Sequence, residues 1–198
     1  MSKRNTIGWI RHGVTEWNRL GRIQGATDTP LSEEGLAQAR LLAERLARES
    51  GRWDGVVASD LQRAAATGRA IADRLGVPFA TDARLRERSF GEAEGTTLPE
   101  RLARWGEHWR DLVPDQETNA ALLERGLAFV DELCGTRPGE AWLVVTHGSF
   151  LATIVPSLTG ETADGYIQNV SLTIMEQTER GWKSLLHNCT LHLQPSTP

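Results

Sequence analysis

The sequence has little cysteine and no long apolar run. Cys134 and Cys189 are the two cysteines among 198 residues, and they form no CxxC motif. This pattern favours reduced, structural thiols over a disulfide framework. No segment approaches the ~18 consecutive apolar residues that a membrane-spanning helix needs, and the first residues lack the apolar core of a signal peptide. We therefore expect a cytoplasmic protein that does not bind a membrane.

An excess of positive charge is also absent. Lys and Arg number 22 against 26 Asp and Glu, which leaves a net charge of −4. Nucleic acids and anionic membranes require cationic surfaces, so neither is an expected partner. The 39% hydrophobic and 24% charged residues are ordinary for a globular protein. With no repeat or linker to divide the chain, we predict a single domain over residues 1–198. The oligomeric state stays open, with a homodimer as one alternative.

Strand-like and helix-like apolar patterns alternate along the chain. Strands are predicted at Thr6–Ile10, Trp53–Ala58, Val77–Ala80, Ala141–Val145, Val170–Glu176 and Trp182–Leu186. Helices are predicted at Ser32–Glu49, Leu61–Leu75, Arg101–Leu112, Asn119–Leu133 and Phe150–Leu158. The first helix carries a one-sided apolar stripe of Leu36, Ala39, Leu42, Ala43 and Leu46. This order predicts an α/β fold, a three-layer α/β/α sandwich with a mixed, mostly parallel sheet. Residues of about 91–133 are expected to form an inserted helical lobe that covers the site.

Three of the predicted strands end in polar residues. His12 follows the first strand, a turn that reaches Arg63 follows the second, and His147 follows the strand at 141–145. The carboxyl ends of parallel strands lie along one edge of a sheet, where such folds bind ligands. These side chains are therefore expected to converge.

Arginine and histidine side chains at such an edge suit phosphoryl transfer. Arg11 and Arg63 offer planar, bidentate donors that match a phosphate group. A neutral histidine such as His12 is able to form a covalent intermediate. In-line transfer also needs a proton for the leaving oxygen, and a carboxylic acid is the missing part. Taken alone, His12 would more often be structural than nucleophilic, so further motifs have to decide.

Six short segments supply those motifs. They are RHGVTEWN at 11–18, QGATDTPLSEEG at 24–35, SDLQRAAAT at 59–67, LRERSFGEAEG at 85–95, THG at 146–148 and NVS at 169–171. Together and in this order they resemble the motifs of the histidine phosphatases, also called the phosphoglycerate mutase-like superfamily. One such match would be weak, whereas six from residue 7 to about 175 are specific.

Carried over position by position, the resemblance implies a metal-independent reaction that needs no cofactor. His12 would be the nucleophile that becomes phosphorylated, and Glu87 would protonate the leaving alcohol and then activate water. The residues implied to hold the phosphoryl oxygens are Arg11, Arg63 and His147. Further phosphate or pocket contacts are implied for Asn18, Thr15, Gln24 and Gly25.

Some positions depart from the common motifs or allow a second interpretation. Val14 and Asp60 stand where relatives frequently have an acidic residue and a proline, which affects the rim of the pocket rather than the reaction. Glu87 lies in the charge-rich segment 82–88, where a surface ion pair is the alternative role. Glu92 and Glu94 are rival acids.

Aromatic and histidine residues outside the motifs are open in the same way. Trp105 and Trp109 stand four residues apart on a predicted helix, an arrangement more typical of a core stripe than of a lid over the pocket. Trp17, beside the first motif, has the same two interpretations. The remaining histidines have no spacing typical of metal ligands; they are His108, His187 and His192.

The expected activity is hydrolysis of a small phosphorylated metabolite through a phosphohistidine. A cofactor-dependent phosphoglycerate mutase, which keeps the phosphoryl group for a second acceptor, is the first alternative. The short stretch between Glu87 and His147 favours the phosphatase. A non-catalytic module that binds phosphorylated ligands is the second alternative, although such a binder needs neither a nucleophile nor an acid.

Overall fold

A six-stranded sheet runs through the centre of the computed structural model, which describes residues 4–49, 51, 53–161 and 165–194. The strands are β1 (Thr6–Arg11), β2 (Gly55–Ala58), β3 (Phe79–Thr81), β4 (Ala141–Thr146), β5 (Leu172–Thr178) and β6 (Gly181–Cys189). They lie in the order β3-β2-β4-β1-β5-β6. The first four in that order are parallel, and β5 and β6 form an antiparallel hairpin beside β1. The predicted mixed, mostly parallel sheet is confirmed.

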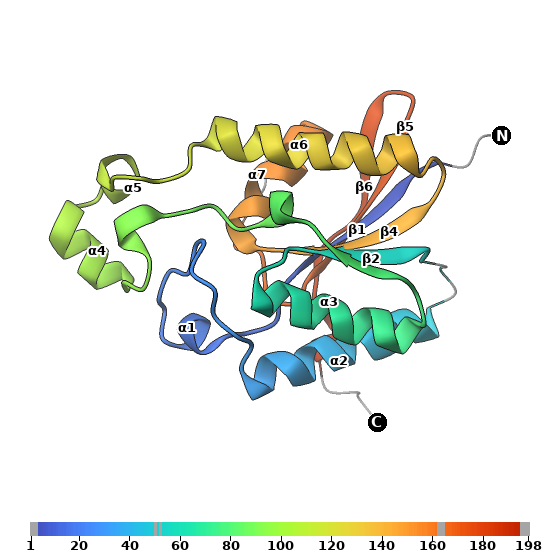
Figure 1. Cartoon of the computed structure of the whole chain (residues 1–198), viewed down its shortest axis with the longest axis horizontal. Coiled ribbons are helices and arrows are strands. Elements are labelled where there is room, and N and C mark those ends of the chain that lie inside the picture. Colours follow the sequence, from blue (N-terminus) through green and yellow to red (C-terminus); the bar gives the residue numbers. More distant parts are fainter. Residues whose placement is uncertain (1–3, 50, 52, 162–164, 195–198) are drawn as a thin grey trace.

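Helices cover both faces of the sheet and complete the predicted three layers (Figure 1). On one face lie α2 (Glu33–Arg48) and α3 (Gln62–Leu75), and on the other α6 (Asn119–Thr136) and α7 (Gly148–Thr159). Alternate residues of a strand point to opposite faces, so β1 and β4 serve two apolar clusters. Trp9 and Val144 pack with the α6–α7 side, and Ile10 and Val145 pack with the α2–α3 side.

The first turn of α2 packs against the loop that follows β1. Ser32 caps the helix, and its hydroxyl oxygen accepts a hydrogen bond from the N–H of Gly35 (3.1 Å). Leu36, predicted to lie in the apolar stripe, is exposed (37%). The buried position is taken by Gly35, where an added Cβ would meet the carbonyl oxygen of Val14. This close approach fixes the loop that carries the RHG motif.

Residues between β3 and α6 leave the sheet and form a small lobe. Its two short helices are α4 (Leu98–Trp105) and α5 (Trp109–Leu112). Its own apolar cluster consists of Phe90, Ala93, Trp109 and Val113, with Ile23 and Trp105 packed against it. Figure 1 shows α4 and α5 at the left, away from the sheet, whereas α6 lies along the sheet near α7. The predicted insertion at 91–133 thus divides between a projecting lobe and a helix of the sandwich.

The prediction of one continuous helix over Arg101–Leu112 is wrong. Gly106 adopts a left-handed conformation (φ 73°), which ends α4, and α5 begins three residues later. Trp105 and Trp109 therefore belong to different helices. Trp109 is buried and Trp105 packs against the same cluster.

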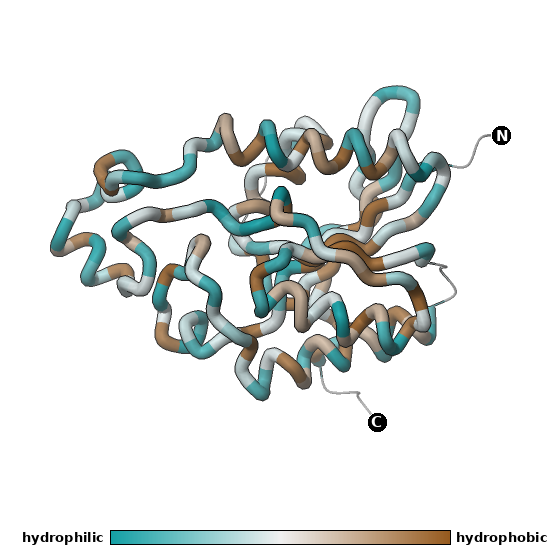
Figure 2. The backbone as a smooth tube through the Cα atoms, in the orientation of Figure 1, coloured by the Kyte–Doolittle hydropathy of each residue, from teal (hydrophilic) through white to brown (hydrophobic). Residues whose placement is uncertain are grey.

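Hydrophobic residues concentrate in the strands at the centre and alternate with hydrophilic ones along the covering helices (Figure 2). Within the described residues, no helix combines the length and the apolar character that a membrane crossing demands. Cys134 and Cys189 are both free and half-buried.

Candidate active site

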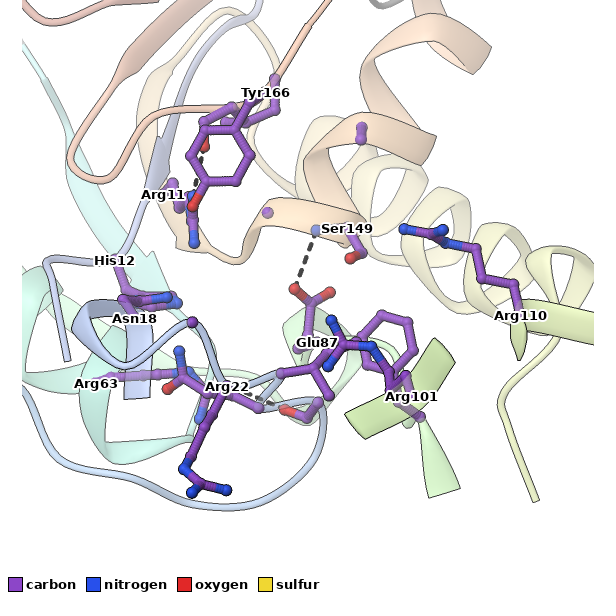
Figure 3. Close-up of a pocket in the computed structure, with 18 of the residues that line it drawn as sticks. Arg11, His12, Asn18, Arg22, Arg63, Glu87, Arg101, Arg110, Ser149 and Tyr166 are labelled. Carbon is purple, nitrogen blue, oxygen red and sulfur yellow. Dashed lines mark hydrogen bonds between the residues drawn. The ribbon is translucent and has the colours of Figure 1, made fainter. Parts of the chain in front are cut away.

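A cavity of about 420 Å³ opens where the parallel strands end (Figure 3). Segments far apart in the chain line it. His12 lies just after β1, Arg63 in the first turn of α3, Glu87 after β3, and Ser149 at the start of α7. The ring of His147 lies 5.1 Å from that of His12. The structure thus brings together the strand ends that the sequence analysis singled out.

His12 is buried, and one of its ring nitrogens is fixed by the backbone. Its Nδ1 lies 2.7 Å from the carbonyl oxygen of Gly13. A carbonyl oxygen only accepts, so Nδ1 carries the proton and Nε2 carries the lone pair. Burial, together with the charges of Arg63 and Arg11, lowers the pKa of His12 well below its ordinary value. At neutral pH the ring is therefore uncharged and has a free Nε2.

His147 is fully buried beside His12 and occupies the N-cap position of α7. Burial lowers its pKa well below the ordinary value, with smaller contributions from Arg63 and His12. Neither ring nitrogen has a hydrogen-bond partner within the described part of the chain. His147 is not among the residues that line the cavity, so its single N–H donor would reach an anion only where that anion extends to the His12 ring.

Arg11 and Arg63 are both buried, and each is only partly satisfied by the protein. Arg11 donates to the carbonyl oxygen of Ile167 (2.5 Å) and lies over the ring of Tyr166, 4.7 Å from its centroid. Arg63 donates to the carbonyl oxygens of Thr27 (2.8 Å) and Gly25 (2.7 Å). Burial lowers the pKa of Arg63 to about 10, so it remains charged at neutral pH.

Four buried nitrogens at this end of the cavity thus share one property. Among the described residues they have no hydrogen-bond partner; they are Arg11 Nε, Arg63 Nε and both ring nitrogens of His147. Buried donors without a partner are rare and destabilising, by roughly 1–3 kcal/mol each. An anion with several acceptor oxygens, such as a phosphoryl group, would accept from the two arginine Nε–H groups and from the one N–H of the neutral His147 ring.

Two amide side chains face the same cavity. The Oδ1 of Asn18 accepts from the backbone N–H of Thr15 (3.1 Å), and the Oε1 of Gln24 accepts from the hydroxyls of Thr15 (3.0 Å) and Thr29 (2.5 Å). With the oxygens held, the NH₂ groups of both amides are left to donate. Gly25 also lines the cavity.

Thr15 has a different place from the one that the resemblance implied. It is fully buried and does not line the cavity. Its hydroxyl oxygen accepts from the backbone N–H of Asn18 (3.1 Å) and caps the short helix α1 (Glu16–Arg19). Thr15 therefore orients Asn18 and Gln24 rather than facing a ligand.

Glu87 is held at the amino end of α7. Its carboxylate accepts hydrogen bonds from the backbone N–H groups of Ser149 (3.0 Å) and Phe150 (3.0 Å). The positive end of a helix dipole favours a carboxylate in that position. Glu87 forms no ion pair within the described residues, which argues against the surface-pair alternative. In Figure 3 it lies across the cavity from His12.

The rival acids have other partners. Glu94 accepts from the backbone N–H groups of Ala26 (2.9 Å), Thr27 (2.8 Å) and Phe90 (2.9 Å), which ties the lobe to the rim. Glu92 pairs with Arg104 (2.5 Å) on the surface. Neither lines the cavity, whereas Glu87 does.

Asp60, at the position where relatives frequently have proline, turns away from Arg63. It accepts two hydrogen bonds from Arg86, at 2.7 and 2.5 Å. These contacts lower the pKa of Asp60, so the carboxylate stays charged and paired. Asp60 thus does not compete with a phosphoryl group for Arg63.

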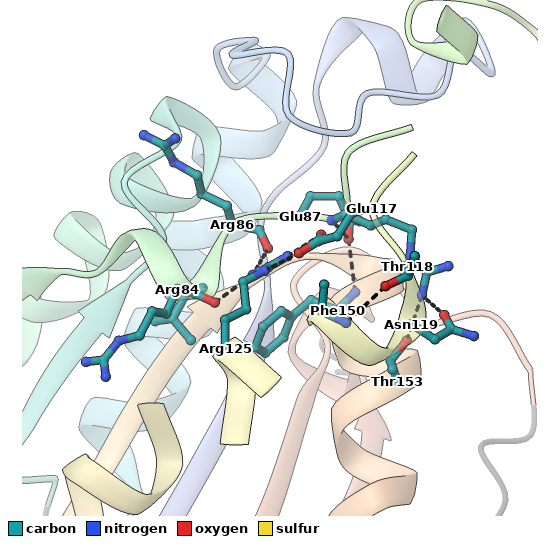
Figure 4. Close-up of polar contacts among 12 residues, drawn as sticks. Arg84, Arg86, Glu87, Glu117, Thr118, Asn119, Arg125, Phe150 and Thr153 are labelled. Atoms are coloured by element: carbon teal, nitrogen blue, oxygen red, sulfur yellow. Dashed lines mark hydrogen bonds and ion pairs between the residues drawn. The ribbon is translucent and has the colours of Figure 1, made fainter. Parts of the chain in front are cut away.

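A half-buried ion pair between Arg125 of α6 and Glu117, which lies just before that helix, holds the segment that presents Glu87 (Figure 4). Arg125 donates through one terminal nitrogen to the carbonyl oxygens of Arg84 (2.6 Å) and Arg86 (2.7 Å). Its other two nitrogens donate to the carboxylate of Glu117 (2.6 and 2.8 Å). The fork of Arg125 thereby fixes the backbone on the amino side of Glu87.

Five polar side chains of the cavity were not predicted from the sequence; they are Arg22, Arg101, Arg110, Ser149 and Tyr166. Ser149 directly follows the THG motif, so the motif could have indicated this residue. The three arginines lie in ordinary charged segments, where an arginine is usually solvated, and carry no signal of their own. Among the residues that the structure describes, no tryptophan lines the cavity. Trp109 lies in the core of the lobe, and Trp17 lies beside Gly95.

No group of three or more His, Cys, Asp or Glu residues is arranged to hold a metal ion in the part of the chain that the structure describes.

Comparison with known proteins gives a consistent family. The family model of the histidine phosphatase superfamily (branch 1) matches residues 7–190. The chain is 32% identical over 187 residues to a protein of Bacillus subtilis strain 168 named uncharacterized phosphatase PhoE, covering 93% of this chain and 94% of that protein. It is 34% identical over 186 residues to a Yersinia pestis protein named probable phosphoglycerate mutase GpmB, with coverage of 87% and 85%.

A solved structure gives the same family likeness. A mycobacterial glucosyl-3-phosphoglycerate phosphatase superimposes with a TM-score of 0.83 at 28% identity, covering 93% of this chain and 99% of that one. The likeness thus extends over nearly the whole of both chains.

Proposed function

The chain belongs to the histidine phosphatase superfamily, branch 1, and from this premise we propose that it hydrolyses small-molecule phosphate monoesters through a phosphohistidine on His12. The state of His12 carries the proposal. Its imidazole is buried and neutral, and Gly13 holds the Nδ1 proton (2.7 Å), which leaves Nε2 as a nucleophile. A carboxylate, Glu87, lines the same cavity.

The reaction takes two in-line steps. In the first, His12 Nε2 bonds to phosphorus while the bond from phosphorus to the alcohol oxygen breaks, and protonated Glu87 gives its proton to that oxygen. In the second, the Glu87 carboxylate takes a proton from water, the water oxygen bonds to phosphorus, and the bond to Nε2 breaks. One ester and one water become one alcohol and one inorganic phosphate, and both residues return to their starting states.

The unpartnered nitrogens around His12 support the same assignment. Arg11 Nε, Arg63 Nε and the N–H of neutral His147 would donate to the phosphoryl oxygens, with the amide groups of Asn18 and Gln24 beside them. Donors already fixed in place stabilise charge that develops in the transition state without reorganising. The fixed arginine charges take the part that a metal ion plays in other phosphatases, so activity should survive exhaustive treatment with EDTA.

A phosphoglycerate mutase is the second candidate, favoured by the 34% identity to the mutase-named relative. Such an enzyme would return the phosphoryl group from His12 to a second hydroxyl. Incubation with 3-phosphoglycerate followed by ³¹P NMR separates the two activities. Accumulating inorganic phosphate is the result expected here, and accumulating 2-phosphoglycerate would establish the mutase instead.

The experiment that tests the proposal directly is turnover of p-nitrophenyl phosphate by the purified protein and by His12→Ala. The unmodified protein should release p-nitrophenol, and the variant should be inactive because no neighbouring group replaces the covalent step. A protein that binds inorganic phosphate but never turns over would be the non-catalytic module considered above.

The two free thiols, Cys134 and Cys189, support a cytoplasmic location, where thiols stay reduced.

A further inference from the structure

The cavity carries more positive charge than one phosphoryl group requires. Among the described residues, five arginines line it, Arg11, Arg22, Arg63, Arg101 and Arg110, against one carboxylate, Glu87. The chain as a whole has a net charge of −4, so this excess is local. Arg11 and Arg63 beside His12 already match a phosphoryl dianion, and Arg22 is 3.8 Å from the carboxylate of Glu100. Within the part of the chain that the structure describes, Arg101 and Arg110 form no ion pair.

Arg101 and Arg110 are built into the lobe around one aromatic ring. Their guanidinium carbons lie 4.7 and 4.4 Å from the centroid of the Trp109 ring. Trp109 is itself 2% exposed, so the ring is a fixed platform. Stacking on an aromatic face leaves the edge of a guanidinium, with its N–H donors, free for a ligand.

Arg101 is the more informative of the two, because it is only 7% exposed. One terminal nitrogen donates to the carbonyl oxygen of Thr96 (2.5 Å), and Nε has no partner within the described residues. Burial lowers its pKa, and the nearby charge of Arg110 adds to this effect. Neither arginine forms an ion pair with a carboxylate among the described residues. A buried, unpaired cation is destabilising unless an anion binds beside it.

We propose that Arg101 and Arg110 form a second anion subsite, so that the substrates are phosphate monoesters with another anionic group, a carboxylate or a second phosphate. The inference rests on the proposed function. Arg101 and Arg110 belong to α4 and α5 of the lobe, and Figure 3 shows Arg110 on the far side of Glu87 from His12. The scissile phosphate would therefore lie at His12, and the second anion would lie against the lobe.

Matched alkyl phosphates test this subsite. Each set has one chain length, from three to eight carbons, and ends in a methyl group, a carboxylate or a second phosphate. At the best chain length, kcat/KM for an anionic end should exceed that for the methyl end by at least tenfold. The carboxylate and phosphate arms show which anion the subsite accepts. Arg110→Gln, and separately Arg101→Gln, should reduce this preference by about tenfold, as expected for loss of a charge-assisted hydrogen bond.

Arg104→Gln is the matched control. Arg104 lies on α4 beside Arg101, pairs with Glu92 on the surface and does not line the cavity. This variant should keep the preference for an anionic end. Arg110 is exposed, so its variant tests the subsite even where Arg101→Gln disturbs the lobe.

Two outcomes would overturn the inference. One is hydrolysis of methyl-ended and anion-ended esters at equal kcat/KM, and the other is an equal change of preference in Arg104→Gln and Arg110→Gln. Both outcomes count against the subsite only when the protein hydrolyses p-nitrophenyl phosphate, which shows that it is active. Failure to hydrolyse any phosphate monoester would instead refute the proposed function.

Discussion

At the scale of single residues, burial sets the charge state of the groups around the cavity. His12 and His147 are kept neutral, because burial and Arg63 lower the pKa of each ring. Arg63 stays charged, since its pKa of about 10 lies above neutral pH. A neutral nucleophile beside fixed positive charge is the combination that attack on a phosphate dianion requires.

Arg63→Lys tests the role of the guanidinium fork. Lysine keeps the charge but loses the planar donors, two of which are already used on Thr27 and Gly25. We expect kcat/KM for p-nitrophenyl phosphate to fall by roughly 10²–10³, as for the loss of a transition-state donor. Arg69→Lys is the control, because Arg69 lies on the same helix over the ring of Phe79 and does not line the cavity. Equal rates in both variants would place Arg63 outside the phosphate site.

The site residues that could be predicted from the sequence are those that follow the end of a strand or lie in a short motif. His12, Arg63 and Glu87 belong to this group, because a strand end or a short spacing determines where each one lies. Arg101 and Arg110 could not be predicted as cavity residues, since they reach the cavity only through the packing of two short helices around Trp109. Local sequence does not encode that packing.

At the scale of elements, α6 connects the sandwich to the candidate acid. Arg125 and Glu117 are about one-fifth exposed and form a bidentate pair. The same guanidinium binds the carbonyl oxygens of Arg84 and Arg86, and Glu87 follows directly. Arg125 is therefore a positioning residue, which acts on the reaction through Glu87.

Arg125→Lys should misplace Glu87 without removing it. We expect kcat for alkyl phosphates to fall about tenfold more than kcat for aryl phosphates, since an aryl leaving group needs little protonation and a general acid contributes roughly 10²–10⁴. The ratio of the two rates is the readout, because a general loss of folded protein would lower both equally.

Arg137→Lys provides the comparison for this experiment. Arg137 lies at the carboxyl end of α6 over the ring of Trp142 and does not line the cavity. The positioning role is contradicted if Arg125→Lys leaves the ratio of alkyl to aryl rates unchanged.

Most element positions were predictable because apolar periodicity determines which face is buried. The observed ends of helices and strands differ from the predicted ends where backbone geometry determines them. β2 begins at Gly55 rather than Trp53, and Gly106 divides the helix predicted over Arg101–Leu112. In the first turn of α2 the buried residue is Gly35 rather than the predicted Leu36, because the RHG loop lies too close to the helix to leave room for a side chain. These are tertiary contacts, which periodicity does not contain.

At the scale of the whole molecule, the strand order places the site. β1 lies between β4 and β5, and β4 lies beside β2, so the polar ends of β1, β2 and β4 are neighbours. The sequence predicted that these ends share an edge, but their order depends on how the crossovers pack, which the sequence pattern did not specify.

Burying two neutral histidines makes the stability of the fold depend on pH. The folded pKa of His12 and of His147 is lowered, so below about pH 6.5 the unfolded chain binds protons that the folded chain does not. The free energy of unfolding should therefore decrease as pH falls, by about 1 kcal/mol per histidine between pH 7 and 5.5. Urea denaturation at the two pH values measures it.

Burial also lowers the pKa of His192 to about 4, so this ring adds a similar contribution. His147→Phe should therefore show roughly two-thirds of the total decrease, and His108→Asn, at an exposed position, should show all of it. A free energy of unfolding that stays constant between pH 7 and 5.5 in the unmodified protein would contradict the burial of neutral rings.

The measurement that tests the central claim most directly is the trapping of the covalent intermediate. The protein is mixed with a ³²P-labelled aryl phosphate, quenched in alkali within milliseconds, and digested to locate the label. We expect label on the peptide that contains His12, stable in alkali and lost in acid, as an N–P bond requires, and no label in His12→Ala. Label on another residue, or turnover without any labelled protein at the earliest times, would contradict a phosphohistidine on His12.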